Sequence, residues 1–482
     1  MPTEKMELET IIGLEIHAQI ATKSKMFCSC SANAYNAEPN ENTCPVCMGF
    51  PGQLPVINAE AVRKGAIAAM ALQCTIPEYS KFDRKNYFYP DSPKGYQISQ
   101  FDKPLSEHGK ITIRVNGEDK VIGITRLHLE DDAGKLTHVD RGTLCDFNRA
   151  GVALMEIVSD PDMRSAAEAA AYAKEIQVIV RYVGSSDADM EKGMMRFDAS
   201  VSLRPKGDTK LYARAEIKNL NSFKTLEAAI QYEISRQRKL WEEGKPQDKD
   251  ITVGWKEEKQ ATYFMREKEG ADDYRYFPEP DLPPLGLSEA ILNELRSSLP
   301  ELPAVRRGRY IRDFALSEAD VELLTEDKDL AAYFENTLKV ATHDPKKVAS
   351  FITTVVLRFL KEDAKDIVEC PVSPEHLGEL LNAVESGKIS NNMAKGEIFE
   401  EMYLKGKSPL EIIKEKGLEQ VSDTGEIEKI AGEVLGMHAD QVAEYKSGKV
   451  KVFGFLVGQV MARMKGRANP GVVNDVVKKL LE

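Results

Sequence analysis

The sequence contains no long apolar run. None of its 482 residues belongs to a stretch that approaches the roughly 20 apolar residues of a membrane span. The opening residues, MPTEKMELET, also lack the basic segment followed by an apolar segment that marks a secretory leader. We therefore expect a cytoplasmic protein that does not interact with a membrane.

Cysteine is scarce, and its number, seven, is odd. Four of the seven are clustered, which suits a reducing compartment and a metal site better than a disulfide framework. The chain also lacks a GxxxxGK[ST] motif and the glycine pattern of dinucleotide-binding folds. Any nucleotide is therefore held by something other than a P-loop.

Positive charge is in deficit, because the net charge is −12. This balance argues against a protein that coats nucleic acid, although binding responds to a local patch and not to the sum. The composition, 42% hydrophobic and 29% charged, is that of a soluble globular protein. Its length exceeds what one hydrophobic core supports, so we expect roughly two to four domains.

Residues 26–49, MFCSCSANAYNAEPNENTCPVCMG, contain the pattern Cys28-x-Cys30, thirteen residues, Cys44-x-x-Cys47. The pattern resembles a zinc knuckle or ribbon, in which four thiolates bind one ion at about 2.3 Å. Such a site is structural, because four cysteine ligands leave no open position for a substrate. The alternative is four reduced cysteines without a metal.

Residues 11–20, IIGLEIHAQI, alternate apolar and polar side chains with the period of a β-strand. One face supplies a core, and the other presents Glu15 and His17, which project from the same side of the strand. Four further segments divide in the same way. They are 123–131 with Arg126, His128 and Glu130, 152–158 with Glu156, 195–204 with Arg196 and Asp198, and 211–218 with Glu216 and Lys218.

Glu156 is informative because it lies alone in an apolar strand, VALMEIV. An unpaired buried carboxylate costs several kcal/mol, so this residue must be exposed or paired. Acidic groups from several strands that face one hollow repel one another unless a hard cation such as Mg²⁺ neutralises them. The candidate set is Glu15, His17, Glu130, Glu156 and Asp198. Histidine is a less usual Mg²⁺ ligand, and the alternative for the whole set is a solvated sheet face.

Residues 80–102, SKFDRKNYFYPDSPKGYQISQFD, combine four lysines and arginines with six aromatic rings. Prolines and a glycine exclude a regular helix here. Cations and rings together suit contact with phosphates and bases, and Lys94 is one such cation. The alternative, a solvated loop with aromatic anchors in the core, fits the composition equally well.

The order of elements favours an α+β fold. Helices are predicted at 59–73 after the N-cap Asn58, from a Ser165/Glu168 capping box to about residue 183, and from the N-cap Ser222 to before Gly244. Strands outnumber helices up to this point, which favours an antiparallel or mixed sheet with helices on one side over alternating βαβ units. From Ser288 onward the sequence is helical by period.

The C-terminal segment from Lys446 carries eight lysines and arginines against two acidic residues, a net charge of 8 − 2 = +6. Asn469 and Pro470 supply an N-cap and a first residue for a final helix. A basic helical tail on an acidic protein indicates contact with an RNA backbone.

Several long runs carry a family resemblance. IIGLEIHAQI, KMFCSCS, CPVCMGFPGQLPVIN, SKFDRKNYFYPDSPKGYQISQFD, RLHLEDDAGKL, DFNRAGVALMEIVSDPD, EIKNLNSF and DYRYFPEPDLPP closely resemble the B subunits of the glutamyl/aspartyl-tRNA amidotransferases. The tail run KVFGFLVGQVMARMKGRANP resembles the C-terminal helical domain of that family. Together these runs cover essentially the whole chain.

The resemblance implies a cradle-shaped catalytic domain at residues 1–290, a helical domain at 291–407 and a helical tail at 408–482 that binds tRNA. It also implies an ATP- and Mg²⁺-dependent reaction on Glu-tRNA(Gln) or Asp-tRNA(Asn). The side-chain carboxylate is phosphorylated, and ammonia then displaces phosphate to give Gln-tRNA(Gln) or Asn-tRNA(Asn). An amidase releases the ammonia from glutamine, and a small protein tethers the two larger chains; these partners are the A and C subunits of the family's complex.

The resemblance also assigns roles to residues. The Mg²⁺-binding and catalytic positions look like Glu15, His17, Glu130, Glu156 and Asp198, and the four cysteines resemble those of zinc-bearing members. Lys94, Arg126 and Lys218 are candidates for phosphate or ammonia-channel contacts. Two other classes stay open: a stand-alone metal-dependent hydrolase that turns over without tRNA, and a non-catalytic tRNA-binding scaffold that tolerates the loss of Glu156.

Overall fold

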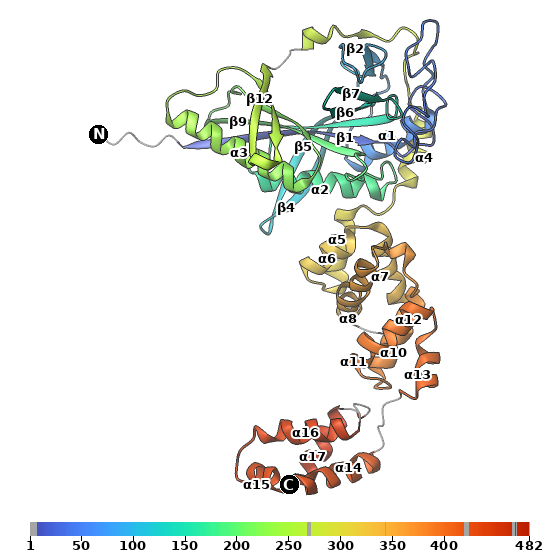
Figure 1. Cartoon of the computed structure of the whole chain (residues 1–482), viewed down its shortest axis with the longest axis vertical. Helices are drawn as coiled ribbons and strands as arrows, with labels where there is room; N and C mark the ends of the chain where they lie inside the picture. Colours follow the sequence, from blue (N-terminus) through green and yellow to red (C-terminus); the bar gives the residue numbers. More distant parts are fainter. Residues whose placement is uncertain are drawn as a thin grey trace, which may run out of the picture. The chain divides into compact units, whose positions relative to one another are not determined.

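The structure is a computed structural model that describes residues 7–267, 271–342, 344–418, 424–464, 468 and 470–481. The chain divides into two compact units, Met1–Ala304 and Val305–Glu482. The first unit carries the sheet and the second is helical (Figure 1). This arrangement confirms the α+β class with a helical C-terminal region.

Eight strands of the described first unit form one sheet in the order β12-β11-β10-β9-β1-β8-β5-β4 (Figure 1). Neighbouring strands run antiparallel, except β10 and β11, which are parallel. The strands are β1 (Leu8–Gln19), β4 (Ser106–Val115), β5 (Glu118–Asp131), β8 (Ala153–Ser159), β9 (Met195–Pro205), β10 (Ala215–Leu220), β11 (Ile251–Lys256) and β12 (Ala261–Glu267). The five strands that the alternation predicts are therefore the middle of a larger mixed sheet.

Short strands build two small additional sheets that the sequence pattern did not predict. β2 (Asp83–Asn86) pairs with β3 (Tyr96–Ser99) and with β13 (Phe277–Pro278), and β6 (Lys135–Val139) pairs with β7 (Gly142–Asp146). These strands are too short and too polar for alternation to reveal them. The aromatic and basic run 80–102 is accordingly a hairpin, with its prolines in the turn between β2 and β3.

The sheet has one apolar and one polar face. On β1, Ile12, Leu14 and Ile16 are fully buried, whereas Glu15 and His17 on the opposite side are half-buried. The apolar side shares one core with helices α1 (Ala59–Ala71), α2 (Ala166–Tyr182) and α3 (Phe223–Glu242). Packing of helices on this side leaves the polar face of the central strands for chemistry.

The three helices begin at the predicted N-caps, since Asn58, Ser165 and Ser222 each accept backbone N–H bonds through their side chains. The predicted capping box at Ser165 is incomplete. The Glu168 carboxylate accepts the backbone N–H of Arg164, 2.7 Å away, instead of the N–H of the cap residue. The helix is therefore fixed one residue earlier than the motif predicts.

The predicted strand at 211–218 begins later than the alternation indicates, at residue 215. The Arg214 backbone N–H donates to the Asp250 carboxylate over 3.0 Å, so this N–H is not available for a ladder. At the other end the pairing with β9 becomes irregular, and Asn219 adopts a positive φ of 60° while its N–H donates to Asp198. Side-chain acceptors thus decide both ends of β10.

The helices that follow the sheet begin with α4 (Glu289–Ser298), which Ser288 caps. The others are α5 (Pro303–Phe314), α6 (Glu318–Thr325), α7 (Lys328–Val340), α8 (Pro345–Phe351), α9 (Leu357–Glu362), α10 (Pro374–Glu385), α11 (Asn391–Met393), α12 (Phe399–Lys405), α13 (Pro409–Lys416), α14 (Thr424–Met437), α15 (Ala439–Lys446), α16 (Val452–Arg463) and α17 (Pro470–Leu481). No helix among the described residues is long and apolar enough to cross a membrane.

Two clusters of buried residues lie in the second unit. One extends from Tyr310 to Leu418 and includes Ile412 and Ile413 of α13, and the other extends from Ile427 to Leu481. The predicted domain boundaries at 290 and 407 stay predictions. The predicted N-cap Asn469 lies outside the described residues, and α17 begins at Pro470 as predicted.

Candidate active site

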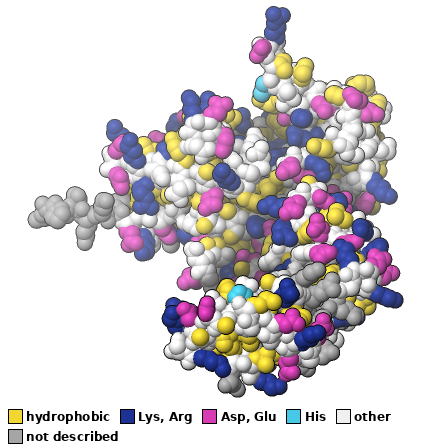
Figure 2. All heavy atoms as spheres, turned by 60° about the horizontal axis from the view of Figure 1, so that its bottom comes forward, with side chains coloured by type: hydrophobic (Ala, Val, Ile, Leu, Met, Phe, Trp, Pro, Cys, Tyr) yellow, Lys and Arg dark blue, Asp and Glu magenta, His cyan; other side chains and the backbone are white. Residues whose placement is uncertain are grey.

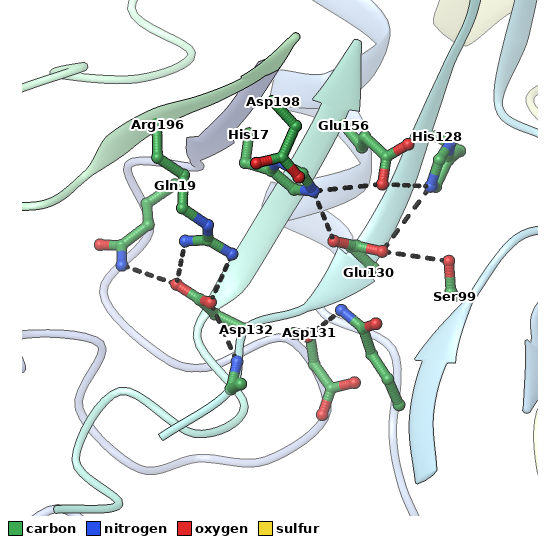
Figure 3. Close-up of polar contacts among 12 residues, drawn as sticks. His17, Gln19, Ser99, His128, Glu130, Asp131, Asp132, Glu156, Arg196 and Asp198 are labelled. Carbon is green, nitrogen blue, oxygen red and sulfur yellow. Dashed lines mark hydrogen bonds and ion pairs between the residues drawn. The ribbon is translucent and has the colours of Figure 1, made fainter. Parts of the chain in front are cut away.

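The polar face of the central strands gathers two imidazoles and two carboxylates (Figure 3). The β1–β8 register places His17 opposite Glu156, and the β5–β8 register places His128 opposite the same Glu156. Glu130 lies two residues after His128 on β5 and so projects from the same face. Figure 3 shows all four side chains directed toward one point.

These four side chains form a close network. The Nε2 atom of His17 lies 3.2 Å from Oε2 of Glu156 and 3.9 Å from Oε1 of Glu130. The Nε2 atom of His128 lies 3.4 Å from the same oxygen of Glu156 and 3.6 Å from Oε2 of Glu130. The Ser99 hydroxyl donates to Glu130 over 3.1 Å. Each imidazole therefore contacts both carboxylates.

Electrostatics explains how two carboxylates are tolerated inside the protein. Burial raises the pKa of Glu156, but His128 and His17 more than reverse this and hold the pKa well below its usual range. Burial lowers the pKa of His128, and the two carboxylates outweigh burial and raise the pKa to about 9. Without a metal ion the charges of this network are thus carried by imidazolium and carboxylate groups.

The same residues offer ligands to a divalent cation. One ligand atom each from His17, Glu130 and Glu156 lies within 4.8 Å of the other two. The Nδ1 atoms of His17 and His128 are buried and have no hydrogen-bond partner among the described residues. Carboxylate oxygens are the ligands that Mg²⁺ prefers, and imidazole nitrogen is accepted by Mn²⁺ as well. The donor set therefore fits a hard divalent ion.

Glu15 and Asp198 lie beside this group on the same face, directly opposite each other in the β1–β9 pair. The Asp198 carboxylate accepts from Lys218 over 2.7 Å and from the Asn219 N–H over 2.8 Å. Burial and the neighbouring Glu156 raise the pKa of Glu15. The structure thus brings three of the five predicted ligands into one group, and metal binding by Glu15 and Asp198 stays a prediction.

The three predicted phosphate or channel cations differ in their surroundings. Lys94 forms an ion pair with Asp131, and Lys218 pairs with Asp198. Arg126 donates from Nη1 to the Phe101 carbonyl over 3.3 Å, and its Nε atom is buried without a partner among the described residues. Arg126 is therefore the one of the three whose polar atoms are incompletely satisfied.

Sequence reasoning did not include several residues that complete the site. His128 shares the strand face of Glu130, so its parity was the available signal. Lys85 of β2 lies 5.1 Å from the Tyr274 ring, and burial lowers its pKa while Tyr276, Glu130 and Glu156 reverse this and raise it above its usual value. A short hairpin strand gives no periodic signal that points Lys85 to this face.

A second polar group lies next to the first (Figure 3). Asp132 accepts from Arg196 over 3.0 Å and from Gln19 over 2.9 Å. Burial raises the pKa of Asp132, but Arg196 and Arg149 outweigh burial and lower it to about 2. This carboxylate is therefore fixed as an anion that orients the Arg196 guanidinium.

The four cysteines come together as predicted. Sulfur atoms of Cys28, Cys30, Cys44 and Cys47 lie within 4.8 Å of one another, and those of Cys44 and Cys47 are 3.8 Å apart. A tetrahedral ion with Zn–S bonds of about 2.3 Å requires sulfur atoms roughly 3.8 Å apart. A hydrogen bond from Cys28 lowers the pKa of Cys47 to about 4, so a thiolate is available. The donors fit a closed zinc site.

A cavity of about 660 Å³ opens along the polar face beyond Glu15. Its lining is mostly polar and comes from β1, β9 and the segment before β10. It includes Glu15, Thr125, Ser200, Tyr212, Arg214 and Asp250. Because Glu15 borders both the cavity and the carboxylate group, a molecule in the cavity can reach the His17, Glu130 and Glu156 side chains.

The basic tail has an exposed set of cations. Lys446, Lys449, Lys451, Arg463, Lys478 and Lys479 are all exposed, whereas positions 465 and 467 lie outside the described residues. Val473, Val476 and Val477 of α17 are buried, as the predicted apolar side requires. Figure 2 shows lysine and arginine side chains interspersed with acidic ones over the visible face. This surface offers separate points of phosphate contact.

The chain is similar to known proteins over nearly all of its length. Residues 10–293 match the family described as the GatB/GatE catalytic domain, and residues 332–481 match the GatB domain. Its relatives include the B subunits of the aspartyl/glutamyl-tRNA(Asn/Gln) amidotransferases from three bacteria. The protein of Persephonella marina is 49% identical over 477 residues, which are 99% of this chain and 100% of that protein. Those of Geotalea uraniireducens and Carboxydothermus hydrogenoformans are 50% identical over 481 residues and 47% identical over 480 residues. They cover 99% and 98% of this chain, and 100% and 99% of those proteins.

These matches confirm the resemblance carried by the sequence runs. The match spans the polar-faced sheet with its cysteine element and continues through the helical tail. The chain therefore belongs to the GatB/GatE family of tRNA amidotransferase B subunits.

Proposed function

We propose that the polar face around His17, Glu130 and Glu156 is where the side-chain carboxylate of a misacylated tRNA is phosphorylated and then amidated. The chain is part of a tRNA-dependent amidotransferase, a ligase that forms a carbon–nitrogen bond with glutamine as amide donor. The observation that carries the placement is the group of convergent ligand atoms beside the 660 Å³ cavity.

The chemistry explains why such a site is needed. A carboxylate is a poor electrophile, because its negative charge repels nucleophiles and oxide is a poor leaving group. Transfer of the γ-phosphoryl group of ATP to a carboxylate oxygen gives an acyl phosphate and ADP. Ammonia then attacks the carbonyl carbon, the bond from that carbon to the phosphate oxygen breaks, and amide and inorganic phosphate leave. The protein must position anions and neutralise their charge more than supply a covalent nucleophile.

The chain offers the groups for this task on one face. His17, Glu130 and Glu156 would hold Mg²⁺, which when bound neutralises charge on the phosphates. Arg126, with its unsatisfied Nε, and Lys85 supply positive charge from the protein around the same point. The Ser99 hydroxyl keeps Glu130 oriented.

We place the nucleotide in the cavity beyond Glu15, with its phosphates toward the carboxylate group. The family uses ATP, and the cavity of about 660 Å³ lies in the volume range of pockets for small ligands, roughly 300–1,000 Å³. Lys218 and Asp198 lie at the boundary between cavity and metal ligands, where a phosphate would displace part of the ion pair. Lys94, already paired with Asp131, is kept as a channel candidate.

The relatives are named as B subunits, which indicates an enzyme of several different chains that acts on tRNA. We propose that the A and C subunits are an amidase that supplies ammonia and a small tethering protein, and that the exposed basic tail contacts tRNA. Zinc in the four-cysteine element is structural, because no coordination position is left open. Zinc-bound thiolates need a reducing environment, in keeping with the cytoplasm.

Reconstitution tests the proposal. The chain is combined with the amidase and the small tethering protein, glutamine, ATP, Mg²⁺ and either Glu-tRNA(Gln) or Asp-tRNA(Asn), and amidated tRNA is measured. Formation of Gln-tRNA(Gln) or Asn-tRNA(Asn) that requires ATP supports the proposal and identifies the substrate. Turnover of a small substrate without tRNA would instead indicate a hydrolase, and full activity without Glu156 would indicate a scaffold.

A further inference from the structure

Lys25 is a fully buried lysine, with none of its surface exposed. Its ammonium group lies between the four-cysteine element and the segment that enters β8. It donates to the carbonyl oxygens of Asn42 and Ala150 over 2.7 Å and of Phe147 over 3.2 Å, and to the Cys47 sulfur over 3.7 Å. One side chain therefore joins two segments more than 100 residues apart in sequence.

The surroundings of this ammonium group are unusual for a buried cation. Within the part of the chain that the structure describes, no carboxylate lies within ion-pair distance of Lys25, so the Cys47 sulfur is its anionic partner. A buried charge without a counter-charge is strongly unfavourable. Four thiolates around Zn²⁺ carry a net charge of −2, so the loaded cysteine site would supply the missing compensation.

The segment that Lys25 holds leads directly to the catalytic face. The Gly151 N–H donates to the Asp132 carbonyl and the Met26 N–H to the Gly151 carbonyl, both over 2.8 Å. Asp132 orients Arg196, and β8 carrying Glu156 begins at Ala153. A displacement of residues 147–151 would therefore reach both polar groups of the site.

The two segments fit together with little free space. Gly151 has a φ of 89°, and a Cβ atom at this position would lie 3.2 Å from the Cys47 Cβ and 3.4 Å from the Lys25 Cδ. The Asn42 N–H also donates to the Asn148 side chain over 2.8 Å. Tight packing transmits small displacements instead of absorbing them.

We propose that Lys25 is a positioning residue that couples metal occupancy of the four-cysteine site to the geometry of the catalytic face. Metal-bound thiolates hold the ammonium group, the ammonium group holds the carbonyls of residues 147 and 150, and these hold Asp132 and the start of β8. The activity part of this proposal rests on the proposed function, whereas the metal-retention part does not.

The experiment compares wild type with Lys25→Met, which keeps the length of the side chain and removes its charge, and with Lys25→Arg. Lys23→Met is the matched control, because Lys23 is exposed two residues away. Zinc release to a chromogenic chelator is measured on the full chain. Amidation is measured on the assembled complex, with zinc present and after zinc has been stripped and Mg²⁺ restored.

We expect zinc release from Lys25→Met to be roughly 10- to 100-fold faster, the range for partners of metal ligands, with no change in Lys23→Met. We expect kcat for amidation to fall while KM for tRNA and glutaminase activity stay unchanged, and Lys25→Arg to recover part of kcat. Stripping zinc from wild type should lower kcat by the same factor and should lower Lys25→Met no further, because both changes break one connection.

Unchanged zinc release in Lys25→Met, or losses that multiply when the variant is stripped of zinc, would overturn the proposal. If Lys25→Met does not assemble, the wild-type comparison still decides: kcat that is insensitive to zinc removal rejects the coupling, and a loss reversed by added zinc supports it. Inactive wild-type complex would contradict the proposed function and leave the zinc-release result to test Lys25.

Discussion

One carboxylate oxygen of Glu156 lies between two imidazoles, 3.2 Å from Nε2 of His17 and 3.4 Å from Nε2 of His128. The three residues come from three adjacent strands and face one another in register. Because both nitrogens address the same oxygen, a proton or a metal ion at this oxygen is shared by the whole group. Changes at Glu156 should therefore alter charge, metal binding and catalysis together.

Removing either buried carboxylate should abolish ATP-dependent amidation. Glu156→Gln and Glu130→Gln keep the shape of the side chain but lose the charge that balances a divalent ion. We expect amidated tRNA to form at least about 100-fold more slowly, while the glutaminase activity of the complex stays measurable. Glu118→Gln on the exposed start of β5 is the control. Near-normal Gln-tRNA formation by either variant would contradict the assignment.

The same group should bind Mn²⁺, which replaces Mg²⁺ and is visible by electron paramagnetic resonance. Titration of the full chain should show binding that His17→Gln and Glu130→Gln weaken by about 10-fold or more, because each removes one ligand. Glu118→Gln should bind as wild type does. Equal Mn²⁺ affinity in all variants would place the metal elsewhere.

The placement of the nucleotide predicts a steric effect in the cavity. Ser200 lines the cavity from β9, and Ser200→Tyr would occupy part of its volume. We expect KM for ATP to rise by about 10-fold or more, with glutaminase activity retained, since the ring competes with a ligand of similar size. Ser235→Tyr on the exposed side of α3 serves as the control. Unchanged KM for ATP would exclude this cavity.

Asp132 should make stability depend on acid. Its pKa is lowered from 3.8 to about 2 in the folded state, so its contribution is complete above pH 4 and is lost as pH falls toward 2. We expect Asp132→Asn to lower the free energy of unfolding by about 2 kcal/mol at pH 7 and by less at pH 3.

Both tryptophans, Trp241 and Trp255, lie in the first unit, so their fluorescence follows unfolding of the sheet. Urea unfolding at pH 7, 4 and 3 measures the difference between wild type and variant. A difference that stays constant across this range would show that the charge of Asp132 is not involved.

Deletion of the tail should weaken tRNA binding. Ile412 and Ile413 are buried with the helices before them, so a cut after Leu418 removes the basic helices and leaves that cluster intact. We expect a strong rise in the dissociation constant for tRNA. Reversal of Lys446, Lys449 and Lys451 to glutamate should also flatten the dependence of affinity on salt by roughly one ion per lost contact. Unchanged tRNA affinity would show the tail to be ordinary surface.

The sequence by itself determined the local features of this protein. The alternation in residues 11–20 reports a strand with one buried face, since period 2 is a property of neighbouring residues. Asn58, Ser165 and Ser222 report helix starts for the same reason. The spacing of the four cysteines and the long family runs indicated the metal element and the family, and the comparisons confirm the family.

Only the tertiary structure decided which polar groups meet. His17 and Glu156 are 156 − 17 = 139 residues apart, and strand register, which packing of the apolar face selects, makes them neighbours. Register also pairs Asp198 with Lys218 and brings His128 and Lys85 to the site. The contact of Lys25 with Cys47 and residue 150 depends on the folding of two loops, which carry no periodic signal.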